Sequence, residues 1–294
     1  MRKYLEVTLG VLTAIGGFVD IGDLVANGTV GGRFGWSLAW AIPVGVGGIV
    51  VFAEMAGRVA SMTKRATFDL VRERLGPRVA LGNLVASLFV TFLTLVAEVA
   101  GVALALQLAT GVNYLLFVPL CAALVWLVIW RVRFSQMERV FGLLGLALVV
   151  FAVAAWRLVP DWGTVLDHAR RPTVPVGEGR ATYWYYAIAL FGAAMTPYEV
   201  FFFSSGAVEE RWTRSDLVLN RTNVFIGFPL GGLLSLAIMT CTAIVFQPEG
   251  VAVDHLGDQV NRPWTNAIAT AYLLVIAVAA TAAIPLMIAT KAGA

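Results

Sequence analysis

The stretch that decides the fold lies near the start of the chain and reads IGGFVDIGDL over residues 15–24. It places two carboxylates, Asp20 and Asp23, around a glycine inside an apolar segment that covers roughly residues 5–32. Glycine weakens a helix, and an acidic group at the centre of a bilayer costs about 2.5–3.5 kcal/mol or more. We therefore predict a helix that is interrupted at mid-membrane depth and that serves a function there.

A second stretch carries the same combination of a helix breaker and a carboxylate. Residues 191–199 read FGAAMTPYE, with Pro197 two residues before Glu199. Proline removes a backbone donor and clashes with the preceding turn, and broken backbone at this depth needs protein or a water-filled cavity to satisfy it. The breaks fall in the first and sixth apolar elements, which is the layout of an inverted five-helix repeat around a substrate site.

The composition excludes a water-soluble protein. Of the 294 residues 59% are hydrophobic and 13% are charged, with a mean hydropathy of +0.82, whereas soluble domains carry about 25% charged residues. Four stretches without any charge are each about as long as the roughly 20 residues that a spanning helix needs; they cover residues 34–53, 112–130, 222–248 and 263–290. The fold class is therefore an all-α integral membrane protein.

Eight apolar elements are predicted, and no polar connection between them is long enough for a separate soluble domain. We expect residues 1–294 to form one transmembrane transporter domain, with a first repeat over about 5–157 and a partial second repeat over about 182–289. The elements lie at about 5–32, 35–57, 79–110, 112–130, 138–157, 182–208, 222–247 and 264–289.

The distribution of basic residues sets the expected orientation. With the N-terminus inside, 15 of the 21 Lys and Arg residues fall in inner loops and 6 in outer loops, as the positive-inside rule requires. We expect a multi-pass protein of the cell membrane with a cytoplasmic N-terminus. Its basic charge indicates the lipid bilayer rather than nucleic acid, and the sequence carries no signal for an oligomeric state.

Three carboxylates at the paired breaks predict a cation site. If the breaks converge, Asp20, Asp23 and Glu199 offer up to six oxygens, and Thr196 and freed backbone carbonyls add more. Such a cluster repels itself unless protons or a cation neutralise it, and a hard divalent ion is the economical partner. The alternative is that the groups are protonated and only link helices.

Two further acidic residues lie in or near apolar segments. Glu98 is either a polar group that packs helices together or a proton site, and the sequence does not separate these roles. Glu54 precedes Arg58 by four residues, which favours an ion pair along one helix face.

The motifs resemble the Nramp family of divalent-metal transporters. Residues 19–23 resemble the Asp-Pro-Gly-Asn signature of its first helix, 28–40 and 97–108 resemble its next segment and its third helix, and 192–198 take the place of its sixth-helix Met-Pro-His motif. This resemblance implies a LeuT-type fold that holds metal between the first and sixth helices. The expected metal set is Asp20, Asp23, Ala193, Thr196 and Glu199.

Three departures from the family pattern change the expected ion. Asp23 replaces the family's Asn, Thr196 replaces its Met, and Tyr198 replaces its His. A thioether favours soft transition metals, so the chain resembles the Nramp-related magnesium transporter branch and we expect Mg²⁺ or Mn²⁺. Met195 is out of register by about 100° of helix. Without the histidine, Glu98 and Tyr198 are the candidates for a proton or accessory site, and we expect no obligatory proton coupling.

Other functions fit the sequence less well. Family members usually have ten to eleven helices, so the second repeat is expected to be incomplete, and a fragment and a non-transporting remnant remain alternatives. An organic-substrate permease of the same fold is another, although three acidic groups disfavour an anionic substrate. An intramembrane enzyme needs a nucleophile–base pair or a His-rich site, and the sequence shows neither. We expect no enzyme activity and no cofactor, with the divalent cation as substrate.

Overall fold

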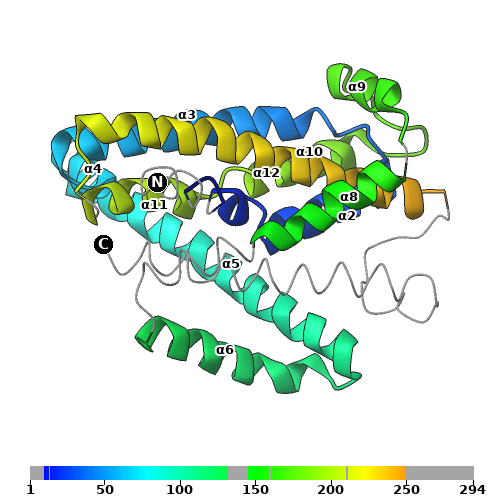
Figure 1. Cartoon of the computed structure of the whole chain (residues 1–294), viewed down its shortest axis with the longest axis horizontal. Helices are drawn as coiled ribbons and strands as arrows, with labels where there is room; N and C mark the ends of the chain where they lie inside the picture. The colour runs from blue at the N-terminus through cyan, green and yellow to red at the C-terminus, as the bar shows by residue number, and fades with distance from the viewer. Residues whose placement is uncertain (1–9, 13, 132–144, 159, 210, 249–294) are drawn as a thin grey trace, which may run out of the picture.

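The structure is a computed structural model that describes residues 10–12, 14–131, 145–158, 160–209 and 211–248 (Figure 1). Every regular element within these ranges is helical. The helices are Gly10–Phe18, α2 (Ile21–Phe34), α3 (Ala41–Thr63), α4 (Thr67–Leu75), α5 (Pro77–Thr110), α6 (Tyr114–Arg131), the 3₁₀ turn η1 (Gly145–Leu148), α8 (Val149–Arg157), α9 (Trp162–Arg170), α10 (Arg180–Ala193), α11 (Pro197–Glu209), η2 (Arg214–Asp216) and α12 (Leu217–Val245).

Several of these helices are long and apolar enough to cross a membrane. Four spans meet this test alone, and up to six do so if each of two bent helix pairs forms one span. The described helices overlap seven of the eight predicted apolar elements; residues 5–9 of the first, residues 138–144 of the fifth and the whole of the eighth, 264–289, lie outside the described residues. The spans are Ala41–Thr63, Pro77–Gln107, Arg180–Glu209 and Arg214–Val245, and the bent pairs are Gly10–Phe18 with α2 and α8 with α9.

Element boundaries differ from the sequence prediction where local backbone geometry decides them. The clearest shift is in α3, which the sequence predicts from residue 35 but which begins at Ala41. Gly35 ends α2 with a positive φ of 60°, and turns follow it. Two short helices, α4 and α9, lie in connections predicted to be polar loops. None of the residues of α4 is buried, so the apolar pattern that marks the other helices could not reveal it.

The helix α12 lies at the centre of the bundle and packs against α2, α3 and α8 (Figure 1). In its most apolar window 61% of the residues are buried, compared with 28% in α5. Large apolar side chains on α5 and α6 are exposed instead, among them Phe89, Phe92, Leu116 and Leu120. Such a surface suits contact with lipid chains, which is what a membrane-spanning protein presents on its outside.

A glycine lets α12 approach α2 closely. A methyl group added at Gly31 would lie 2.1 Å from Thr242 Oγ1 and 2.3 Å from the backbone oxygen of Met239, both on α12. Small residues at helix crossings allow this kind of backbone approach in membranes. Nearer the break that precedes α2, Ser235 in the middle of α12 donates a hydrogen bond to Asp23.

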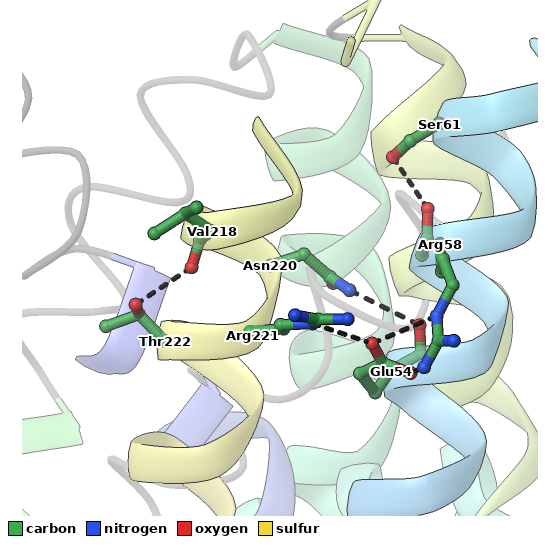
Figure 2. Close-up of polar contacts among 8 residues, drawn as sticks. Glu54, Arg58, Ser61, Val218, Asn220, Arg221 and Thr222 are labelled. Carbon is green, nitrogen blue, oxygen red and sulfur yellow. Dashed lines mark hydrogen bonds and ion pairs between the residues drawn. The ribbon is translucent and has the colours of Figure 1, made fainter. Parts of the chain in front are cut away.

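A buried carboxylate joins α3 to α12 (Figure 2). Glu54 accepts hydrogen bonds from Arg58 Nε at 3.1 Å and from Arg58 Nη2, which confirms the predicted pair along α3. It also accepts from Arg221 Nε of α12 at 3.2 Å, and its backbone oxygen accepts from Asn220 Nδ2 at 3.3 Å. The pair predicted within one helix is therefore part of a contact between two helices.

Candidate functional site

The first break separates the helix Gly10–Phe18 from α2, and the two helices are bent by 54°. Asp20 is the residue before α2 and is only 1% exposed. Its Oδ1 accepts a hydrogen bond of 2.7 Å from the backbone N–H of Asp23. An aspartate in this position caps the free N–H groups of a helix start, so the residue that the sequence predicts as the main cation ligand also begins α2.

The second break lies between α10 and α11. The residues from Ala194 to Thr196 are not helical, and Pro197 begins α11, where its missing N–H is tolerated. Thr196 Oγ1 donates to Glu199 Oε2 at 3.0 Å, and both side chains are buried. Ala193, the last residue of α10, is half-buried.

The two breaks are in contact through Tyr198. Its hydroxyl lies 2.9 Å from the backbone oxygen of Gly17 and 3.1 Å from Asp20 Oδ2, so the phenol can donate to either atom. The side chain is 1% exposed. The structure thus brings Tyr198, predicted as an accessory residue, to the carboxylate of the first break.

Glu98 reaches the same break from α5. Its Oε1 accepts a hydrogen bond of 2.9 Å from the backbone N–H of Ile21, and the side chain is fully buried. Ile21 is the first residue of α2, whose early N–H groups have no partner within the helix. Glu98 therefore makes a contact between helices, as one of its two predicted roles requires.

Asp23 faces a different set of partners. Its Oδ1 accepts from Asn27 Nδ2 at 2.9 Å, and its Oδ2 accepts from Ser235 Oγ of α12. The sequence analysis did not name either partner. Asn27 could have been found, because it lies one helical turn after Asp23. Ser235 could not, because it lies in a charge-free span more than 200 residues away.

Among the described residues, the buried polar atoms without partners at the breaks are all oxygens. Glu98 Oε2, Glu199 Oε1 and Asn27 Oδ1 are buried and have no hydrogen bond. Within the described ranges, none of the four carboxylates Asp20, Asp23, Glu98 and Glu199 forms an ion pair with a basic residue. A buried acceptor needs a donor, water or a cation, and a carboxyl oxygen can instead carry a proton.

The carboxylates do not form a closed cage. In the part of the chain that the structure describes, no three His, Cys, Asp or Glu side chains are grouped so that they could hold a metal ion. Asp20 and Glu199 would have to be joined by neutral oxygens, such as Thr196 Oγ1 and backbone carbonyls. The sulfur of Met195 packs beside Gly48 of α3, where an added methyl group would lie 2.3 Å from it.

The comparisons with known proteins agree with this architecture. The family profile described as natural resistance-associated macrophage protein-like (Nramp) matches residues 10–294. The divalent metal cation transporter MntH 1 of Pseudomonas aeruginosa is 29% identical over 250 residues, which cover 83% of this chain and 56% of that protein. The metal transporter NRAT1 of Oryza sativa subsp. japonica is 30% identical over 230 residues, which cover 73% of this chain and 39% of that protein.

Solved structures show the same fold. A crystal structure of a mutant manganese transporter from Eremococcus coleocola superposes with a TM-score of 0.68 at 22% identity, covering 98% of this chain and 63% of that one. A complex of that transporter with an aromatic bis-isothiourea compound gives a TM-score of 0.66 at 20% identity, covering 95% and 62%. The chain spans a little over half the length of the curated relatives it matches.

Proposed function

Because the chain belongs to the Nramp family, we propose that it imports a hard divalent cation, Mg²⁺ or Mn²⁺, across the cell membrane. The cation passes through a site between the two helix breaks. The proposed ligands are Asp20, Asp23, Ala193, Thr196 and Glu199, with Ala193 contributing its backbone oxygen. Relatives of this chain are named as metal transporters and not as enzymes.

One observation carries the proposal. The hydroxyl of Tyr198 lies within hydrogen-bond distance of both Gly17 O and Asp20 Oδ2. Glu199 is the next residue along α11, so the same contact brings a second carboxylate-bearing segment to the first break. Glu98 and Glu199 each have a carboxyl oxygen without a hydrogen-bond partner. In their ionised form these oxygens attract a cation.

The ligand chemistry favours a hard ion. Every proposed ligand atom is an oxygen, which is the preference of Mg²⁺ and Mn²⁺. The methionine sulfur nearest the second break packs against Gly48 of α3, so it supports no role for a soft ligand. Mg²⁺ also keeps several waters and binds through one or two carboxylates, which suits a site without a closed cage of acidic groups.

We further propose that the breaks are the discontinuous first and sixth helices of an inverted-repeat, LeuT-type domain. In this assignment residues 1–294 form one domain of about eight spanning helices, the first repeat covers about 5–157, and an incomplete second repeat covers about 182–289. The distribution of basic residues supports a cytoplasmic N-terminus. Glu98 and Tyr198 act as accessory groups beside the cation.

The test removes one charge from the first break. Asp20→Asn keeps the side-chain shape and should nearly abolish Mn²⁺ or Mg²⁺ binding, measured by calorimetry on the purified chain. The matched control is Asp161→Asn, because Asp161 is an exposed aspartate that caps α9 in the same way. Unchanged affinity in Asp20→Asn would refute the site, and an equal loss in the control would show an effect of folding.

A further inference from the structure

Asp23 is held by side chains from two helices, and this arrangement has no role in the ligand set proposed above. Asn27 of α2 donates to Asp23 Oδ1 at 2.9 Å and also to the backbone oxygen of Asp23 at 2.8 Å. Ser235 of α12 donates to Asp23 Oδ2. Asn27 and Ser235 are fully buried, and Asp23 is 2% exposed, so water does not compete for these contacts.

The position of Ser235 depends on close packing of α12 against the first break. A methyl group added at Gly231, one helical turn before Ser235, would lie 2.7 Å from Phe18 Cδ1. Phe18 ends the helix that precedes the break. The glycine therefore allows α12 to approach closely enough for the short serine side chain to reach the carboxylate.

Ser235 has a better acceptor in Asp23 than in its own helix. Its hydroxyl also lies 3.3 Å from the backbone oxygen of Gly231, which is the usual partner of a helical serine. A hydrogen bond to a carboxylate is shorter and about twice as strong as one between neutral groups. The hydroxyl proton is therefore directed at Asp23, and α12 becomes part of the environment of the break.

We propose that Ser235 is a positioning residue for the cation site, acting through Asp23. This inference rests on the proposed function of the breaks, which it extends to a third helix. Carboxylates that bind metal ions are themselves held by outer hydrogen-bond donors, and loss of such a donor typically costs about 10–100-fold in metal affinity. One donor on each oxygen fixes the orientation of Asp23 and leaves lone pairs on both oxygens for the ion or its water.

A second observation points to a ligand at the same place. Asn27 uses its amide nitrogen on Asp23, and its own Oδ1 is buried without a partner. The hydrogen bonds that position Asp23 thus leave a neutral acceptor beside it. A cation or an ion-bound water would satisfy this oxygen, whereas a packing role for the three side chains would not require it to stay unpaired.

The experiment is a double-mutant cycle on the purified chain. Ser235→Ala and Ser235→Thr are each made alone and combined with Asp23→Asn, and Mn²⁺ and Mg²⁺ affinities are measured by calorimetry. Asp23→Asn is suitable because it keeps the side-chain shape and removes the charge that strengthens the hydrogen bond from Ser235. The control is Thr222→Val, which removes a hydroxyl near the start of α12 that bonds only to its own helix.

We expect Ser235→Ala to weaken binding by about 10–100-fold, Ser235→Thr to retain most of the affinity, and Thr222→Val to leave it unchanged. Most of the loss should disappear in the Asp23→Asn background. An equal loss in both backgrounds, a loss that threonine does not rescue, or no loss at all would overturn the proposal. If Asp20→Asn abolishes binding while Ser235→Ala does not change it, only this inference fails and the cation site stands.

Discussion

Replacing Glu54 by glutamine tests whether the polar cluster between α3 and α12 stabilises the folded chain. The carboxylate accepts three hydrogen bonds from the guanidinium groups of Arg58 and Arg221, and its side chain is 6% exposed. Hydrogen bonds to charged groups contribute about 1.5–3 kcal/mol each. The arginine side chains are 49% and 59% exposed. Water can therefore replace many of the hydrogen bonds that the guanidinium groups lose when the carboxylate is removed.

These opposing effects predict an order of stabilities. Glu54→Gln loses the charge that both arginines share, and we expect a destabilisation of about 2–3 kcal/mol. Arg221→Gln leaves the carboxylate paired with Arg58 and should cost about 1 kcal/mol. On the scale of soluble domains, where 1 kcal/mol shifts the unfolding temperature by about 2–4 °C, the first variant should lose roughly 4–12 °C and the second roughly 2–4 °C.

The assay is thermal unfolding of the detergent-solubilised chain, followed by size-exclusion chromatography of the protein that remains folded. The control is Arg65→Gln, which lies two residues before α4 and removes an ion pair with Glu73 of α4; the two side chains are 44% and 55% exposed. Such exposed pairs contribute about 0–1 kcal/mol. The reasoning is wrong if Arg221→Gln destabilises as much as Glu54→Gln, because the buried carboxylate would then not be the shared centre of the cluster.

Three further predictions follow from the breaks and the helix crossings. Glu199→Gln should reduce divalent-ion uptake more than Tyr198→Phe, since only the first removes a charge; equal effects would assign the main role to the phenol. Gly31→Ala should destabilise the chain by about 1–3 kcal/mol through overpacking. Gly47→Ala should leave the stability unchanged, because there is open space around Gly47. Equal unfolding temperatures of the two variants would contradict this prediction. In a liposome uptake assay with a pH-sensitive dye, Mg²⁺ and Mn²⁺ should compete with Cd²⁺, and metal uptake should not require proton influx. A strong preference for Cd²⁺ would refute the assignment of a hard ion. Proton influx that follows metal influx and is lost in Glu98→Gln would refute the absence of proton coupling.

The helix starts after Asp20 and at Pro197 could be predicted because their causes are local. A glycine between two aspartates and a proline before a glutamate disturb the helix wherever the chain places them. The structure has a helix start after Asp20 and another at Pro197, as these residues require. The pair of Glu54 with Arg58 was equally accessible, because a spacing of four residues defines it.

The contacts across helices could not be predicted, because they depend on which spans lie side by side. Nothing in the sequence around Ser235 distinguishes it from the other small polar residues of an apolar helix. Its contact with Asp23 comes from the packing of α12 against α2 at Gly31 and against Phe18 at Gly231. The same reason left two roles open for Glu98, whose contact with Ile21 N joins residues 77 positions apart.

The balance of donors and acceptors at the breaks distinguishes a cation from an anionic organic substrate. The donors that reach the four carboxylates are each already engaged: the hydroxyls of Tyr198, Thr196 and Ser235, the amide of Asn27 and two backbone N–H groups. The buried atoms left over at the breaks in the described ranges are oxygens: Asn27 Oδ1 can only accept, and Glu98 Oε2 and Glu199 Oε1 accept when their carboxyl groups are ionised. An anion needs free donors, such as the N–H groups at the start of a half-helix, but Asp20 and Glu98 already occupy N–H groups at the start of α2. A cation needs acceptors, and acceptors are what remain. The hydrogen bonds at the break therefore favour a positively charged substrate, as we propose.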